Sequence, residues 1–190
     1  MAGEARSTRV KPRPPAGGIL VSVDGANAGA VMRTAKRLAS AGPGGRAGIS
    51  RWDASGIFSE LDAAGLETQR PSVRTLLLVY AADLVFRLRW EIRPALAEGR
   101  RVVAAPYVDT AIALGRASGI EEAWLRSLFE FAPVPSDRRF VEGAPATTAG
   151  PGLIEFACRH LVGMESRSAR QDLITRTRAR LKATRRRSRA

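Results

Sequence analysis

A run of small residues follows a short apolar segment near the start of the chain and could bind an anion. The run consists of Asp24, Gly25, Ala26, Asn27, Ala28 and Gly29. Backbone N–H groups at a helix N-terminus can bind phosphate or another anion without help from side chains. Small residues also suit a structural turn between a strand and a helix. The sequence favours the structural turn and leaves the anion site as the alternative.

Charged and phenolic side chains further along the chain form no catalytic motif. Asp83, Arg87 and Glu91 recur every four residues. On a helix this spacing predicts a ladder of ion pairs on a solvated face, with the lining of a cleft as the alternative. Tyr107 and Asp109 place one phenol near one acid, which defines no general-base pair. We therefore expect no catalytic residue.

The chain has one cysteine, Cys158, and one histidine, His160, which lie two positions apart. Two such ligands are too few for a zinc site, so we expect both to be structural and expect no metal. A single cysteine forms no internal disulfide, which agrees with a reducing compartment. The chain has no membrane-spanning apolar run, and its basic N-terminus lacks the apolar segment of a secretory signal. We expect a cytoplasmic protein.

The positive charge is concentrated at the two ends of the chain. Of the net charge of +13, residues 166–190 carry +9 and residues 1–18 carry +3, so residues 19–165 are nearly neutral. The basic residues near the C-terminus are Arg176, Arg178, Arg180, Lys182, Arg185, Arg186, Arg187 and Arg189. They could bind RNA, DNA or another polyanion through phosphate charge, or form only a solvated helix end and tail. No aromatic residue lies among them, so stacking on bases has no support.

Apolar periodicity divides the chain into three parts: a polar arm at 1–18, an α/β domain at 19–165, and a basic helix and tail at 166–190. The pattern predicts strands at about 18–24, 49–52, 101–105 and 138–141. It predicts helices at about 29–40, 71–97, 107–117, 121–132, 152–162 and 166–183, and one containing Ile57, Phe58 and Leu61. Strands that alternate with helices indicate a parallel sheet covered on both faces.

The predicted helix at 71–97 has two apolar stripes on opposite sides. One stripe contains Val73, Leu77, Tyr80, Leu84 and Leu88, and the other contains Leu78, Ala82, Phe86 and Trp90. Two apolar faces predict burial on two sides. One face would pack on the sheet, and the other predicts a symmetric homodimer through this helix.

Three parts of the chain resemble the thymidylate kinases, which are P-loop nucleoside monophosphate kinases. Residues Val21–Gly29 stand where the family has a strand ending in D-G-A-G-K-[ST]. Residues Leu76–Asp83 and Ile92–Val103 are similar to its L-L-F-A-A-D-R helix, its I-x-P-A-L-x-x-G helix end and the next strand. Residues Tyr107–Thr110 and Gly119–Leu125 are similar to Y-x-D-S and G-L-D-x-x-W-L. The resemblance implies an α/β, three-layer α/β/α P-loop kinase-like domain with a parallel sheet. No Arg-rich lid is evident after residue 145, so the lid would be reduced or missing.

The residues that handle phosphate in this family are replaced. Ala28 and Gly29 stand at the P-loop positions of the lysine and of the hydroxyl residue that holds magnesium. Lys36 lies about two helical turns further on and cannot substitute for that lysine. The other replaced positions, which contact metal, substrate phosphate or thymine in the family, are Ala105-Pro106, Leu84 and Leu114-Gly115.

The resemblance also indicates which side chains would lie around the former substrate cleft. They are Arg51, Tyr80, Asp83, Arg87, Tyr107 and Asp109. Arg51 stands roughly where the family has an early loop arginine that contacts the monophosphate. Tyr80 stands where an aromatic ring stacks on thymine, although its periodicity favours a core residue.

These losses all affect one reaction, so the sequence predicts a non-catalytic relative that acts as a binding or interaction module. One alternative is an active dTMP kinase, which would convert ATP and dTMP to ADP and dTDP. ATP and magnesium are expected only under that alternative, and no cofactor is expected otherwise. A second alternative is association with nucleic acid or the ribosome through the basic C-terminal residues.

Overall fold

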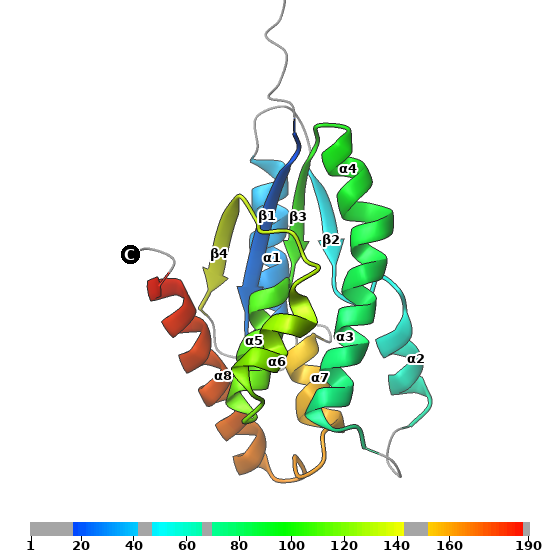
Figure 1. Cartoon of the computed structure of the whole chain (residues 1–190). Helices are drawn as coiled ribbons and strands as arrows, with labels where there is room; N and C mark the ends of the chain where they lie inside the picture. The colour runs from blue at the N-terminus through cyan, green and yellow to red at the C-terminus, as the bar shows by residue number, and fades with distance from the viewer. Residues whose placement is uncertain (1–16, 42–46, 66–69, 143–151, 188–190) are drawn as a thin grey trace, which may run out of the picture.

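A sheet of four parallel strands forms the centre of the protein in a computed structural model (Figure 1). The structure describes residues 17–41, 47–65, 70–142 and 152–187. The strands are β1 (Ile19–Gly25), β2 (Gly48–Arg51), β3 (Arg101–Ala105) and β4 (Asp137–Val141), in the order β2-β3-β1-β4. All four predicted strands are confirmed to within about one residue. The predicted arm at 1–18 lies almost entirely outside the described residues.

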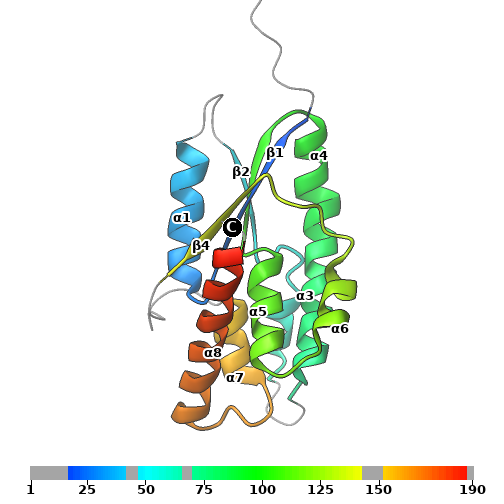
Figure 2. The ribbon, with the colours of Figure 1, turned by 60° about the vertical axis from the view of Figure 1, so that its left-hand side comes forward.

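Helices cover both faces of the sheet, as predicted. They are α1 (Ala28–Ser40), α2 (Ile57–Ala63), α3 (Val73–Arg87), a π-helical segment (Leu88–Ile92), α4 (Arg93–Ala97), α5 (Val108–Ala117), α6 (Glu122–Phe129), α7 (Leu153–His160) and α8 (Arg167–Arg187). Figure 2 shows α1 on one side of the sheet and α3, α5 and α8 on the other. This is the three-layer α/β/α arrangement that the sequence predicts.

Alternate residues of the buried strands pack against the two helical layers. Val21, Val23 and Val103 join a small cluster with Val31 and Ala35 of α1. The neighbouring strand residues, among them Leu20, Val102 and Ala104, belong to the larger cluster on the opposite face. Strands that are apolar on both faces can lie only inside a sandwich of helices, which explains why their sequences show no polar alternation.

The predicted helix at 71–97 is confirmed as one continuous rod made of α3, the π-helical segment and α4 (Figure 1). Ser72 caps its start, because the Ser72 hydroxyl accepts a hydrogen bond from the Thr75 N–H at 3.1 Å. The π-helical segment ends just before Pro94, which has no N–H to donate to the preceding turn. The first apolar stripe is mostly buried, whereas the second, Leu78, Ala82, Phe86 and Trp90, is exposed.

The C-terminal basic region is part of the folded domain. Helix α8 packs against α5, and Leu173, Thr177 and Leu181 are buried. The predicted helix at 166–183 is confirmed and extends to residue 187, and its own apolar positions dock it on the domain. Arg189 lies outside the described residues. Within the described ranges no helix is both long enough and apolar enough to cross a membrane.

Candidate functional site

The run from Asp24 to Gly29 forms a tight connection from β1 into α1, as the favoured sequence interpretation predicts. Asn27 is the N-cap, and its Oδ1 accepts a hydrogen bond from the Ala30 N–H at 2.7 Å. Asp24 Oδ1 accepts hydrogen bonds from the Tyr107 N–H at 2.9 Å, the Thr110 N–H at 3.0 Å and the Thr110 hydroxyl at 2.8 Å. Asp24 thereby fixes the end of β1 to the start of α5.

Burial makes Asp24 a weak acid. Its environment raises the pKa to about 7, first because the carboxyl is removed from water and then because Asp109 is negatively charged. The hydrogen bonds from Thr110 and Tyr107 act in the opposite direction. Within the described part of the chain, the second oxygen, Oδ2, is buried without a hydrogen-bond partner.

The N-terminus of α1 is covered by α7. Glu155 Oε1 accepts a hydrogen bond from the Ala28 N–H at 3.0 Å, so a carboxylate of the chain itself occupies a position where a phosphate oxygen could bind. Gly152 lies against Ala28 so closely that a Cβ at residue 152 would be 2.5 Å from the Ala28 Cβ. The cavity left between the turn, α5 and α7 measures about 10 Å³. That is at most the space of one water molecule and far too little for a phosphate group.

The roles of Glu155 and Gly152 were not predicted from the sequence. The available signal was the Gly-Pro-Gly segment at 150–152 before an acidic first helical turn. Nothing local indicated that this acid would reach a helix start 127 positions earlier.

An open cleft lies between α1 and the loop after β2, and Ala28 and Gly29 at the start of α1 are among its lining residues. Its volume is about 560 Å³, and it contains three cationic side chains, Arg33, Lys36 and Arg51. Asp53 and Ser59 provide polar groups, and Met32, Trp52 and Pro106 are among its apolar lining residues. Of the six residues predicted around the former substrate cleft, only Arg51 lines this cleft.

Asp83 organises the loop after β2 and does not lie on a solvated face. One carboxylate oxygen accepts hydrogen bonds from the Ser55 N–H at 3.0 Å and the Ser55 hydroxyl at 2.8 Å, and the other accepts from the Asp53 N–H at 3.2 Å. Asp53 in turn accepts hydrogen bonds from the Phe58 N–H at 2.8 Å and the Ser59 N–H at 3.0 Å, which caps α2.

Arg87 is fully buried and connects α3 to the ends of β2 and β3. It donates hydrogen bonds to the Ser50 hydroxyl at 3.0 Å, to the Ser50 carbonyl at 2.9 Å and to the Pro106 carbonyl at 2.9 Å. The predicted ion-pair ladder of Asp83, Arg87 and Glu91 is therefore wrong, because the first two side chains bind backbone and hydroxyl groups of the loops that α3 covers. They are structural, and they do not line the open cleft.

The aromatic residues predicted near the cleft are also internal. Tyr80 is buried, and its hydroxyl donates to the Tyr107 carbonyl at 2.8 Å. The Tyr107 hydroxyl donates to the Pro133 carbonyl at 2.9 Å, while Asp109 lies 3.6 Å from Arg138. Contact of Tyr80 with a base is thus contradicted, and the core interpretation is confirmed. Tyr107 and Asp109 have separate structural partners.

Cys158 and His160 have structural environments, as expected. Cys158 is buried, and burial raises the pKa of its thiol to about 11. The His160 ring packs on Phe156, and its Nε2 lies 2.5 Å from Asp62 Oδ1. In the part of the chain that the structure describes, no group of three or more His, Cys, Asp or Glu side chains could hold a metal ion.

Comparison with known proteins gives a match in structure alone. No protein-family model matches the sequence, and no curated protein sequence matches it. The crystal structure of thymidylate kinase from Ehrlichia chaffeensis matches with a TM-score of 0.65 at 14% sequence identity. The match covers 88% of this chain and 81% of the kinase. The chain therefore has the thymidylate kinase fold, the P-loop nucleoside monophosphate kinase architecture that its motifs resemble.

Proposed function

We propose that this protein is a non-catalytic relative of thymidylate kinase that acts as a binding or interaction module. The observation that carries the proposal is the covered N-terminus of α1. The Ala28 N–H is bonded to Glu155 at 3.0 Å, so this donor already has a carboxylate of the chain itself as its partner. A phosphate-transferring loop needs its backbone donors free at this position.

The side chains at the turn support the same conclusion. Ala28 and Gly29 supply neither a cation nor a hydroxyl, and Asp24 is committed to Thr110 and Tyr107. Removing one donor that stabilises a transition state costs a factor of about a hundred or more in rate. Loss of several such groups together leaves negligible phosphoryl transfer.

A coupled ADP-release assay with ATP, dTMP and magnesium tests the proposal on the intact chain. We expect no turnover above the uncatalysed background, and turnover near ordinary kinase rates would overturn the proposal. The Glu155→Ala variant should also be inactive, like its matched control Glu60→Ala, which removes an exposed acid from the first turn of α2. Activity in Glu155→Ala alone would instead identify a self-inhibited kinase.

The open cleft favours small anions as ligands of such a module. Arg33, Lys36 and Arg51 converge on a cleft of about 560 Å³ next to the covered turn. Thermal-shift measurements with nucleotides, nucleosides and inorganic phosphate test this property. Stabilisation by a phosphate-containing ligand that is lost in Arg51→Gln would support anion binding in the cleft, and a null result would favour a protein partner.

The exposed stripe of α3 supports a homodimer. Leu78 and Trp90 are 53% and 62% exposed, and Val85 and Phe86 lie between them on the same rod. A continuous apolar stripe of this kind is typical of a contact surface. Light scattering should show a dimer for the intact chain, and Trp90→Glu should yield monomers. Val134→Glu, which changes an exposed apolar residue outside α3, is the matched control. A stable monomer for the unmodified protein would exclude this interface.

A further inference from the structure

Helix α8 concentrates positive charge on one rigid element. Over 21 residues it has nine cationic side chains and one carboxylate, Asp172, which gives a net charge of +8. At 1.5 Å per residue the helix is roughly 30 Å long. Like charges spaced by four, such as Arg176 with Arg180 and Lys182 with Arg186, repel one another and disfavour the helix. Such a helix needs support from the rest of the fold.

Packing against α5 provides that support and fixes the orientation of the charges. Leu173, Thr177 and Leu181 are buried along one side of α8. Arg176 adds a hydrogen bond of 2.6 Å to the Ala117 carbonyl at the end of α5. The cations of α8 therefore project from a docked helix, so a ligand would not have to order a flexible chain in order to bind them.

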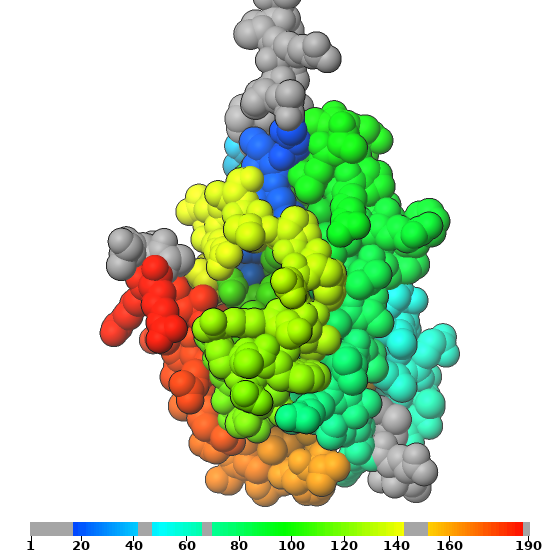
Figure 3. All heavy atoms as spheres, in the orientation of Figure 1, coloured from blue at the N-terminus to red at the C-terminus, as the bar shows by residue number. Residues whose placement is uncertain are grey.

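A basic hollow lies on one flank of α8, beside α5 and α6. Its volume is about 400 Å³, and four arginines line it: Arg116, Arg126, Arg180 and Arg187. Among the described lining residues Glu122 is the one acid, and this carboxylate is bound by Arg116 and lies 3.1 Å from Arg126. The two arginines from α8 add positive charge that Glu122 does not neutralise. Figure 3 shows α8 at the surface beside α6.

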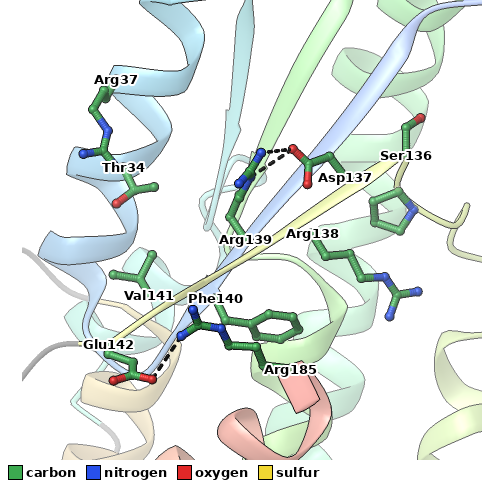
Figure 4. Close-up of a pocket in the computed structure, with 11 residues that line it drawn as sticks. Thr34, Arg37, Ser136, Asp137, Arg138, Arg139, Phe140, Val141, Glu142 and Arg185 are labelled. Atoms are coloured by element: carbon green, nitrogen blue, oxygen red, sulfur yellow. Dashed lines mark hydrogen bonds and ion pairs between the residues drawn. The ribbon is translucent and has the colours of Figure 1, made fainter. Parts of the chain in front are cut away.

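A second hollow lies on the other flank, along β4 (Figure 4). Its volume is about 690 Å³, and the cations that line it are Arg37, Arg138, Arg139 and Arg185. Two acids offset part of this charge, because Asp137 lies 2.7 Å from Arg139 and Glu142 lies 3.1 Å from Arg185. The end of α8 is thus a ridge with arginines on both sides.

We propose that α8 and its two basic hollows form a binding face for the phosphate backbone of double-stranded nucleic acid. Arginine binds phosphate oxygens in a forked geometry, which suits a face whose cations are almost all arginines. Each strand of a duplex carries one negative charge per about 3.4 Å of the axis, and the nine cations along α8 have about the same mean spacing. This role is independent of the non-catalytic function proposed above.

Other anionic partners fit this face less well. Helix α8 has no aromatic residue on which an unpaired base could stack, so a single strand would gain nothing that a duplex lacks. Its apolar residues Leu173 and Leu181 are buried, and it contributes no exposed large apolar side chain that could insert into a lipid interface. The contacts would be to backbone phosphates, without reading of sequence.

Fluorescence anisotropy of the intact chain with a mixed-sequence DNA duplex of about 20 base pairs tests the proposal, since α8 spans about nine base pairs. We expect binding that weakens with salt on a logarithmic slope of about −4 or steeper, because each phosphate contact contributes about −0.9. Absence of binding at low salt would overturn the proposal. So would equal or tighter binding to a single strand, or to vesicles of phosphatidylcholine and phosphatidylserine.

Paired substitutions locate the face. Arg180→Gln with Arg187→Gln should lower duplex affinity about tenfold and reduce the salt slope by about two. The matched control, Arg89→Gln with Arg93→Gln, removes the same charge from exposed positions on the rod of α3 and α4, and should change affinity less than twofold. Equal losses in both variants would mean that net charge alone drives binding, which would overturn the proposal. Substitution is preferred to deletion of residues 175–190, because deletion would remove Thr177 and Leu181 from the core.

Discussion

The N-terminus of α1 and the outer face of α8 differ in how the fold uses groups that attract negative charge. At α1 two backbone donors have partners within the chain, since Glu155 binds the Ala28 N–H and Asn27 caps the Ala30 N–H. At α8 the fold supplies nine cations and a single acid on the same helix. The first region uses internal hydrogen bonds, whereas the second is strongly charged.

The difference shows that the fold persists without a cation or a hydroxyl at Ala28 and Gly29. The sheet and the long α3 rod need only apolar packing and internal hydrogen bonds, and both are present. In phosphate-transferring enzymes with this architecture the start of the first helix binds phosphate. Here Ala28 at that position is in contact with Glu155 and Gly152 of α7 and its N-cap.

The largest effect is expected from loss of the contact that docks α8. Leu181→Ala should lower the free energy of unfolding by about 2–4 kcal/mol, because it removes a buried side chain and leaves a cavity against α5. Urea denaturation followed by circular dichroism measures the change. Thr175→Ala, at an exposed position of the same helix, should change stability by less than about 0.5 kcal/mol. Equal stability of the two variants would mean that α8 does not depend on this contact.

A smaller loss is expected where α7 covers α1. Gly152→Ala should cost about 1–3 kcal/mol, because a new Cβ would be 2.5 Å from the Ala28 Cβ and 2.7 Å from a Glu155 oxygen. The matched control is Gly48→Ala, where an added Cβ would have no atom within 4 Å. Urea titration of both variants measures the difference. Equal free energies of unfolding in the two variants would contradict the close packing of Gly152 on Ala28.

The strands and the long helix were predictable because their signals are local. The apolar runs at 18–24 and 101–105 and the two stripes of residues 71–97 follow directly from side-chain periodicity. Asp83 and Arg87 show where such reasoning fails, because spacing by four describes only the helix on which they lie. Their partners, Ser55 and Ser50, lie 28 and 37 positions away in the sequence.

The contact of α7 with the turn between β1 and α1 was unpredictable for the same reason. Replacement of the lysine and hydroxyl positions by Ala28 and Gly29 was visible in the sequence and indicated lost chemistry. The contact that closes the turn joins Ala28 to Glu155 across 127 positions, in a part of the chain where the family resemblance is weak. Only the packing of α7 brings the two residues together.

The buried carboxyl of Asp24 gives a prediction about how the stability of the fold depends on pH. Its pKa is about 7 in the folded chain, against an ordinary value of 3.8, so between these values the native state holds a proton that the unfolded state has lost. The stabilisation of the folded state by this bound proton is therefore fully present below pH 3.8, and it is lost as pH rises through about 7. Asp24→Asn keeps the acceptor and does not titrate. Relative to the unmodified chain, it should gain about 1 kcal/mol or more between about pH 5 and about pH 8.

Urea titrations at the two pH values measure that gain. Asp172→Asn, which changes an exposed carboxylate on α8, is the control and should show little difference between them. A constant offset between Asp24→Asn and the unmodified chain at both pH values would mean that Asp24 is ionised throughout.

The smallest effect is expected at the basic hollow along β4 and follows from the proposed nucleic-acid face. Glu142 lies 3.1 Å from Arg185 and 3.9 Å from Lys182, so it competes with phosphate for both cations. Exposed ion pairs contribute little to stability, so Glu142→Gln should leave the free energy of unfolding within about 0.5 kcal/mol. Duplex affinity should rise about two- to threefold, since one repulsive charge is removed from the binding face. Anisotropy with the same duplex measures the gain, and Glu60→Gln on α2 is the charge-matched control. A gain of equal size in the control, or weaker binding by Glu142→Gln, would place the duplex away from β4 and confine the binding face to the flank of α8 beside α6.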